Sequence, residues 1–348
     1  MTTKIPAELI STATPLGRRN ILINGDYSIY QRAQQTTGVG ASAAYPTADR
    51  WVINPSTEGR LTMTAGTADA PAESNVTTSL KLACTTADTS VGGDQFCLLD
   101  QRIEGQNLQH VKKGTSGAKQ LTASFWVKGN ASATYVAELY DNDNARQVSK
   151  SFSVTSSWSK VELTFPADTT GTFGNDANLS LIFQIWLLGG SNFTSGTLSE
   201  TWTSVTNANR AVGISNFFSS TSNEFYITAV QLEVGDVATE FEILSYPEKL
   251  VLCQRYFHKA NLPMSATSFY AAGAYSTNWA VGYPFPNEMR ATPTATHSYT
   301  NRDNTASLGT QSYAGALNSH GCRIGGTNSL AAYPYAYWDL TSSFDAEL

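Results

Sequence analysis

The chain of 348 residues is long enough for two domains with separate cores. Only 14% of its residues are charged, and the net charge is −6 without any cluster of Lys and Arg. Because affinity for nucleic acid rests on neutralising phosphates, this balance argues against a nucleic-acid partner. No apolar run reaches the ~18 residues of a membrane-spanning helix, and the N-terminus lacks the apolar core of a signal peptide. We therefore expect synthesis in a cytosol and no insertion into a membrane.

The first third of the chain begins with a segment of low periodicity. Residues 1–19 show no apolar pattern, so we expect an arm that a partner orders. Residues 20–31 alternate on either side of an Asn-Gly-Asp turn and predict a first strand pair or a bulged strand. The Gly, Ala and Ser of residues 34–46 predict a loop, and a strand is expected to start at Trp51.

Rows of alternating apolar residues then recur at short spacing as far as residue 244. The clearest rows run from Leu121 to Val127 and from Leu179 to Leu187. Many short strands, turn-rich spacers and almost no helical periodicity are typical of an antiparallel β-sandwich. We therefore predict a mainly β protein with a jelly-roll sandwich over residues 20–244. Residues 189–222 predict a long surface excursion, ordered by the aromatic residues within it.

A change of pattern after residue 222 marks the end of this sandwich. The alternation slips by one residue near Thr228 and Ala229, which predicts a β-bulge in the closing strand. Ser245, Pro247 and Glu248 then form the start signal of a helix, with Glu248 at the capping-box position. We predict a linker helix over 245–258, packed on most of its surface because apolar residues surround it.

Residues 259–348 predict a small C-terminal β domain that is rich in Tyr, Trp and Phe. About 90 residues make a marginal core, so we expect this domain to trimerise or to contact a receptor. Aromatic residues are the candidates for stacking on sugars, whose apolar C–H faces suit aromatic rings. The alternative is that they fill cores or subunit interfaces, where aromatics are also enriched. The candidates are Trp186, Trp202, Tyr270, Tyr275, Trp279, Tyr335 and Tyr337.

Catalytic chemistry finds no support in the residue pattern. A glycosidase needs a defensible carboxylate pair, and a hydrolytic triad or zinc site needs histidines at suitable spacing. Neither is present, so we expect no enzyme. The four cysteines lack metal spacing and are expected to be buried free thiols. The Asp141-Asn-Asp-Asn144 stretch suits a hairpin turn better than a calcium loop, which would need more oxygen ligands.

Several segments together resemble bacteriophage tail-fibre and related virion proteins. They are RRNILINGDYSIYQR (18–32), DRW (49–51), QRIEGQNLQHV (101–111), LTASFWVKG (121–129), SWSKVELTFP (157–166), FYITAVQLEVGDVATEFE (225–242), LCQRYF (252–257), MRATPT (289–294) and the terminal DAEL. The resemblance implies a virion structural protein, commonly a trimer, that attaches to host-surface polysaccharide. It implies that residues 1–19 join other tail or baseplate proteins, and that the host cytoplasm makes the protein. The alternative is a virion decoration or tail-adaptor protein without a receptor.

Residues 21–242 are also similar to jelly-roll carbohydrate-binding modules, through NGDYS, SFWVKG and ITAVQLEV. That resemblance implies a structural calcium as the one candidate cofactor, with Asp26 as a ligand. It also implies an Asp in the closing strand, where this chain has Thr228 and Ala229.

Overall fold

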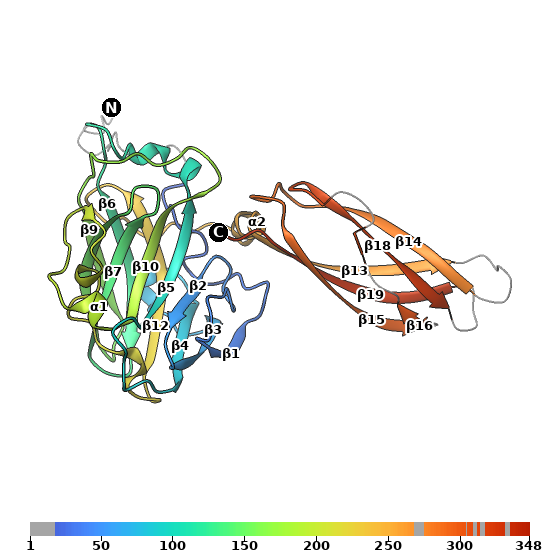
Figure 1. Cartoon of the computed structure of the whole chain (residues 1–348), viewed down its shortest axis with the longest axis horizontal. Coiled ribbons are helices and arrows are strands. Elements are labelled where there is room, and N and C mark those ends of the chain that lie inside the picture. Colours follow the sequence, from blue (N-terminus) through green and yellow to red (C-terminus); the bar gives the residue numbers. More distant parts are fainter. Residues whose placement is uncertain (1–17, 268–274, 304, 309–311, 314–316, 331–334) are drawn as a thin grey trace, which may run out of the picture. The chain divides into compact units, whose positions relative to one another are not determined.

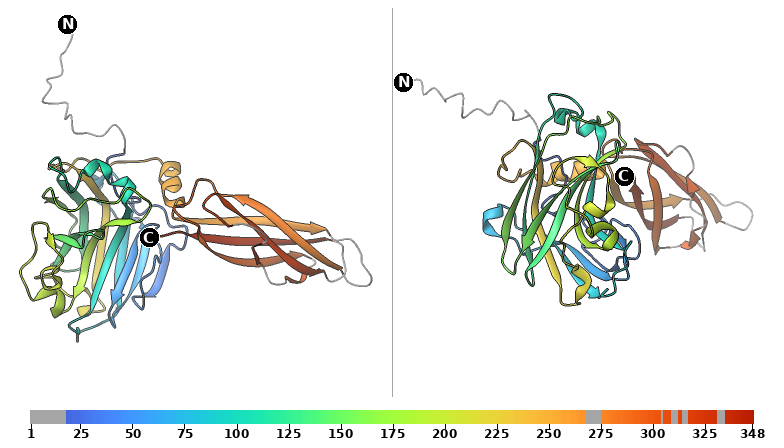
Figure 2. Two further views of the ribbon diagram at one scale, coloured as in Figure 1. Left: turned by 45° about the horizontal axis from the view of Figure 1, so that its top comes forward. Right: turned by 60° about the vertical axis from the view of Figure 1, so that its left-hand side comes forward.

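The computed structural model describes residues 18–267, 275–303, 305–308, 312–313, 317–330 and 335–348, with the side chains of 263–281, 299–316 and 323–338 left undescribed. The chain divides into two compact units, residues 1–244 and 245–348. Figures 1 and 2 show the ribbon of both units.

The first unit is an antiparallel sandwich of two six-stranded sheets (Figures 1 and 2). We call them the β12 sheet, in the order β1-β3-β4-β12-β6-β9, and the β10 sheet, in the order β11-β8-β7-β10-β5-β2. Their strands are β1 (Gln35–Val39), β2 (Val52–Ser56), β3 (Arg60–Thr67), β4 (Ser79–Thr86), β5 (Phe96–Glu104), β6 (Leu121–Gly129), β7 (Ala133–Asp141), β8 (Arg146–Val154), β9 (Ser159–Phe165), β10 (Leu179–Gly189), β11 (Thr203–Ser204) and β12 (Glu224–Val234).

Strand alternation places the core between these sheets. Phe125 on β6 and Phe183 on β10 are fully buried, and their rings meet at 6.3 Å. The predicted rows Leu121–Val127 and Leu179–Leu187 supply inward side chains from both sheets to a single core cluster. This burial of apolar surface is the main force that holds the two sheets together. The predicted mainly β sandwich is confirmed.

The closing strand β12 contains the predicted bulge. Its register against β6 shifts between Thr228 and Gln231, and Ala229 adopts a left-handed conformation at φ 50°. The extra residue turns Val230 and Leu232 to the inner face after Phe225 and Ile227 have occupied it. The predicted β-bulge is therefore the cause of the one-residue slip in the alternation of apolar residues.

Two predictions near the N-terminus are wrong. Residues 20–31 form no strand, because Asn24 and Tyr27 take left-handed conformations and the Asn24 side chain bonds the backbone of Ile29 instead. Residues 35–39, predicted as part of a loop, form β1 and pair with β3. The small residues there are tolerated because β1 is an edge strand.

The excursion between β10 and β12 is ordered, as predicted. It contains α1 (Ser191–Thr194), η5 (Asn207–Asn209) and η6 (Phe217–Ser219), along with β11. Phe217 and Phe218 are fully buried and join the core. Three further 3₁₀ turns lie outside it, namely η2 (Ala72–Ser74), η3 (Gly105–Asn107) and η4 (Gln109–Val111).

The second unit starts with helix α2 (Tyr246–Gln254). The predicted capping box is present, and the Ser245 N–H donates to Glu248 Oε2 at 2.9 Å. The helix ends earlier than the predicted 258, because Phe257 already opens a strand. Tyr246 and Val251 are exposed and Cys253 is the buried residue of α2. The packing around most of the helix stays a prediction.

Two small sheets follow in this unit, in the orders β13-β19-β15 and β14-β18-β16, with β17 paired to β18 (Figure 1). Phe285, Leu340 and Phe344 centre its core. The nearly parallel rings of His258, Tyr283 and Phe344 lie 5.8–6.3 Å from one another beside it. The strands are β13 (Phe257–Thr267), β14 (Tyr275–Pro284), β15 (Thr294–Asp303), β16 (Thr305–Leu308), β17 (Ser312–Tyr313), β18 (Gly321–Leu330) and β19 (Tyr335–Asp345).

The four cysteines are buried and free, as predicted: Cys84, Cys97, Cys253 and Cys322. Among the described residues, no helix combines the length and the hydropathy of a membrane span.

Candidate functional site

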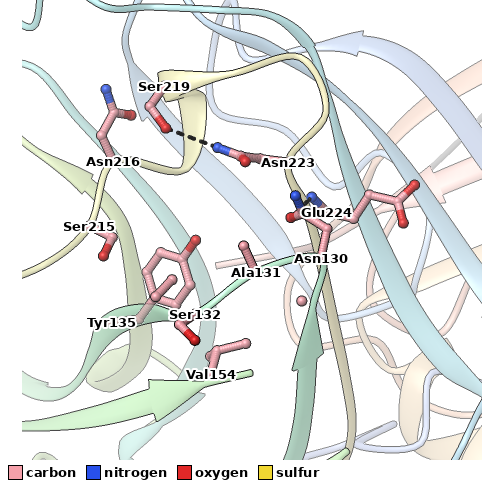
Figure 3. Close-up of a pocket in the computed structure, with 12 residues that line it drawn as sticks. Asn130, Ala131, Ser132, Tyr135, Val154, Ser215, Asn216, Ser219, Asn223 and Glu224 are labelled. Carbon is pink, nitrogen blue, oxygen red and sulfur yellow. Dashed lines mark hydrogen bonds between the residues drawn. The ribbon is translucent and has the colours of Figure 1, made fainter. Parts of the chain in front are cut away.

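A polar pocket lies at one end of the sandwich, where the β6–β7 turn meets the loop that leads into β12 (Figure 3). Its volume is about 290 Å³, near the lower end of the range for small-molecule sites. Three separate segments build it, namely residues 129–135, Val154 at the end of β8, and residues 215–224. We call it the Tyr135 pocket.

Tyr135 forms the floor of this pocket. Its ring packs edge-on against Phe225 at 5.4 Å and lies 6.2 Å from Phe152, so core aromatics fix its orientation. The side chain is 4% exposed, and burial raises the pKa of its phenol, which stays protonated. Its hydroxyl points into the pocket and has no hydrogen-bond partner among the described residues (Figure 3). A buried hydroxyl in this position is set to donate to, or accept from, a ligand.

Amide and hydroxyl side chains form the walls. Asn223 donates through Nδ2 to the Phe217 carbonyl at 2.9 Å and to Ser219 Oγ at 3.0 Å. Asn130 accepts the Glu224 N–H at 2.9 Å through Oδ1. Each of these amides is held by one end, and both residues line the pocket, while no hydrogen bond to a described residue engages the other end, Asn223 Oδ1 or Asn130 Nδ2. Such half-used amides supply both a donor and an acceptor to a polar guest.

The loop that carries the far wall is fixed in place. The Ser215 N–H donates to the Thr134 carbonyl at 2.8 Å, and the Thr134 N–H donates to Ser215 Oγ at 3.0 Å. Asn216 caps η6 by accepting the Phe218 N–H at 2.7 Å and donates to the Asp88 carbonyl at 2.8 Å. With Phe218 buried beneath, the wall is preorganised, which lowers the entropy lost when a ligand binds.

The charge of the pocket is low and negative. Its lining includes no Lys, Arg or His, and Glu224 is the one acidic residue in it. The Glu224 carboxylate pairs with Lys81 at 2.7 Å and accepts the Tyr226 hydroxyl at 2.9 Å. An anionic ligand would meet no cation in this lining, whereas a neutral polyol would meet hydroxyls and amides. The pocket therefore suits neutral, hydroxyl-rich molecules.

Of the predicted sugar-binding residues, Trp186 must be corrected. As the alternation indicated, it points away from the inner core, but it is only 1% exposed. The excursion covers it with Ala211 and Phe193, and its Nε1–H donates to Glu138 at 2.7 Å. Trp186 therefore fills a second, smaller core and has no free face for a sugar.

Trp202 is also engaged within the protein. It packs partly against the core, donates through Nε1 to the Pro166 carbonyl at 2.8 Å, and lies 5.2 Å below the Lys113 ammonium. It does not line the Tyr135 pocket.

The C-terminal candidates stay predictions. Tyr270 lies outside the described residues, as do the side chains of Tyr275, Trp279, Tyr335 and Tyr337. Their backbones place Tyr275 and Trp279 on β14, and Tyr335 and Tyr337 on β19.

The residues around Asp26 do not fit a calcium site. Asp26 Oδ1 accepts the Ser28 hydroxyl at 3.1 Å, and Thr228 of the closing strand gives its hydroxyl to the Thr78 carbonyl at 2.5 Å. Among the described residues no three His, Cys, Asp or Glu side chains converge as metal ligands would. The second carboxylate that the resemblance implies is missing, because the closing strand has Thr228 and Ala229 there, so the ligand set implied for calcium is incomplete.

The Asp141–Asn144 stretch joins β7 and β8 as the predicted turn, and its carboxylate binds a lysine. Lys113 Nζ lies 2.5 Å from Asp141 Oδ2 and 3.0 Å from Asp168 Oδ2, and it donates to the Thr170 carbonyl at 2.7 Å. The Lys113 side chain is 3% exposed, so this ammonium fills the position where a bound cation would otherwise gather these oxygens.

The sequence missed every wall residue of the Tyr135 pocket. Tyr135 alternates with Ala137 and Leu139 along β7, a pattern that indicates a core position, and its ring lies in the core. The Asn and Ser residues come from turns, where these residue types are common for backbone reasons alone. No local signal distinguishes the turn residues that meet at one pocket.

No protein-family model matches the chain, and no curated protein matches its sequence. Among solved structures, the chain is similar to the enzymatically active domain of bacteriophage CBA120 tailspike protein 4, with 11% identity over 62% of this chain and a TM-score of 0.30. The aligned part spans about a fifth of that tailspike chain, 21%. It is also similar to a structure described as CBM4 (13% identity, 61% of this chain, 98% of that one, TM-score 0.32) and to TmCBM61 in complex with β-1,4-galactotriose (10%, 63%, 100%, 0.30). All three TM-scores are below 0.5, so these likenesses carry no conclusion about function.

Proposed function

We propose that this chain is a phage tail-fibre or adhesin-like virion protein that binds a neutral polysaccharide on a host surface without covalent chemistry. The observation that carries the proposal is the Tyr135 pocket, a preorganised cavity of about 290 Å³ lined by hydroxyls and amides and lacking cations. Sugars offer many hydroxyls and few charges, and they need the paired donors and acceptors that Asn, Ser and Tyr supply.

The resemblance of the sequence segments supports the virion part of the proposal. In that setting, residues 1–19 join the chain to tail or baseplate proteins, and the C-terminal unit contributes to a homotrimer. A single shallow polar pocket binds weakly, so attachment depends on several copies that act together. Light scattering of the purified chain is expected to give the mass of a trimer, and a monomer at micromolar concentration would remove the trimer from the proposal.

The test of glycan binding is a microarray that carries neutral and acidic bacterial surface polysaccharides. We expect signals on neutral polysaccharides and none on those whose repeats all carry uronate, sialate or phosphate groups. Binding confined to acidic polysaccharides would contradict the assignment of the Tyr135 pocket. No signal on the array and no adsorption to whole cells would favour the rival function, a structural decoration or adaptor protein.

A further inference from the structure

A second hollow lies on the outer face of the β12 sheet, and no predicted site residue belongs to it. Its volume is about 150 Å³, and Trp126, Lys160, Ala229 and Glu240 contribute to its lining. Trp126 is half-buried and stands on β6 between the inward residues Phe125 and Val127. We propose that this Trp126 hollow is a second subsite for the same class of neutral glycan, which rests on the function proposed above.

The bulge in β12 explains why the hollow exists. Trp126 pairs with Thr228, and the register then shifts before Gln231 resumes opposite Ser124. At the shift, Ala229 lines the hollow with only a methyl group, in the left-handed conformation that it adopts. A regular strand would bring a larger outward side chain next to the indole ring, because alternation would continue unbroken.

The walls of the Trp126 hollow are fixed by hydrogen bonds. The Thr239 N–H donates to Glu233 Oε1 at 2.8 Å, and the Glu242 N–H donates to Gln231 Oε1 at 2.8 Å. These bonds hold residues 239–242 against the sheet. On the other side, the Ser74 hydroxyl donates to the Pro71 carbonyl at 2.6 Å and orders the turn that carries Glu73. The cavity is therefore formed before any ligand arrives.

The chemistry of the lining fits a sugar ring. An indole face can pack against the C–H face of a pyranose, while carboxylates and hydroxyls accept and donate around its edge. Glu73 and Glu240 are exposed carboxylates that can accept sugar hydroxyls, and Lys160, paired with Glu162 at 2.6 Å, can donate. With charges of both signs at the rim, the hollow favours a neutral polar guest over a strongly anionic one.

The two hollows are separate but lie along the same strands. Gly129 lines the Tyr135 pocket and Trp126 lines the other, three residues apart or about 10 Å along β6. Lys128 donates to Asp69 at 2.6 Å, and the Thr228 hydroxyl donates to the Thr78 carbonyl at 2.5 Å. These two bonds fix both ends of residues 69–78 on the outer face of the β12 sheet. One polysaccharide chain engaged at the first hollow would hold its next units at a high local concentration near the second.

Affinity electrophoresis tests the proposal, with gels that contain dextran, laminarin, xylan, galactan or mannan. The variants are Trp126→Ala, Trp126→Phe and Ala131→Trp, where the last fills the mouth of the Tyr135 pocket. On a polysaccharide that retards the wild type, we expect Trp126→Ala to weaken binding about tenfold, the effect of one lost aromatic contact. Trp126→Phe should restore part of it, and thermal unfolding should verify that the variants fold.

Each outcome separates the two proposals. Weaker binding in both Trp126→Ala and Ala131→Trp supports two subsites. Unchanged retardation of a folded Trp126→Ala, with loss in Ala131→Trp, overturns the second subsite and leaves the proposed function standing. If none of the five polysaccharides, and no glycan on the array, binds the wild type, then the proposed function fails and the subsite fails with it.

Discussion

Strand alternation turns a tryptophan outward on each of the two sheets of the sandwich, but only one of these two outer faces is left open. On the β10 sheet, Trp186 points outward but lies beneath the excursion, where its indole N–H reaches Glu138 and the Arg210 guanidinium lies 5.0 Å from its ring. On the β12 sheet, Trp126 also points outward and borders an open hollow. Alternation therefore decides which face a residue occupies, and the segment folded over that face decides whether the residue can meet a ligand.

The largest effect is expected on the covered face. Arg210 donates to both oxygens of the fully buried Glu138, at 2.9 and 3.1 Å. Arg210→Met would leave this carboxylate buried without its cation, at a cost of about 3–5 kcal/mol in the free energy of unfolding. Urea denaturation measures the loss. In the matched control Lys150→Met, whose partner Glu200 is exposed, the loss should stay below about 1 kcal/mol; equal losses in both variants would contradict the distinction.

The next effect is a pH dependence that Asp100 brings to the same face. Burial raises the pKa of this carboxyl to about 7, although Arg102, Asn54 and Arg50 beside it act in the opposite direction. Between about pH 4 and 7 the folded state holds a proton that the unfolded chain has released, so this group makes stability fall as pH rises. The slope is at most about 1.4 kcal/mol per pH unit.

Asp100→Asn should remove that slope, which urea denaturation at pH 5, 6 and 7 would reveal as a difference between variant and wild type. The comparison is needed because burial lowers the pKa of His258 to about 4, and a buried neutral histidine makes stability rise with pH in the same range. Parallel curves for the two proteins would show that Asp100 does not titrate in this window.

A smaller effect is expected at the open pocket. Tyr135→Phe removes one hydroxyl and leaves the ring packed against Phe225. Binding to the neutral polysaccharide that gives the strongest array signal should weaken by about 0.5–1.5 kcal/mol, the net worth of one hydrogen bond. The melting temperature should barely change, because no described residue bonds this hydroxyl. Unaltered affinity would remove Tyr135 from the binding site.

The smallest effect is expected at the ion pair of Lys128 with Asp69, which lies between the two hollows. Lys128 lies 4.5 Å from the Tyr226 ring and 5.2 Å from the Trp158 ring, and it pairs with the half-exposed Asp69. Because solvent screens this pair, Lys128→Met should cost only about 0.5 kcal/mol in the free energy of unfolding. A loss as large as that of Arg210→Met would mean that the Lys128–Asp69 pair is a main stabilising contact of the β12 sheet.

Sequence reasoning reached the elements that local patterns determine. The long row on β10, the bulge at Ala229 and the capping box at Ser245 each depend on neighbouring residues, and each is present. It failed where distant segments decide the outcome. The excursion covers Trp186, and residues 35–39 become a strand because β3 offers an edge.

Most residues of the candidate site could not be predicted from the sequence, for the same reason. Asn130, Ser215 and Asn223 come from turns that meet only in the folded chain. Trp126 is the exception, because it is the single large aromatic at an outward position of the LTASFWVKG row. A search for outward aromatics would have found both Trp126 and Trp186, and only the structure separates the open residue from the covered one.

The central claim is that the Tyr135 pocket binds a neutral glycan, and filling the pocket tests it most directly. Ala131 is exposed in the β6–β7 turn and lines the pocket, so Ala131→Trp places an indole at its mouth. The control is Ala41→Trp, because Ala41 is exposed and lines neither hollow. On the neutral polysaccharide array we predict at least a tenfold loss of signal for Ala131→Trp and none for Ala41→Trp. Equal signals for Ala131→Trp and the wild type would contradict the claim.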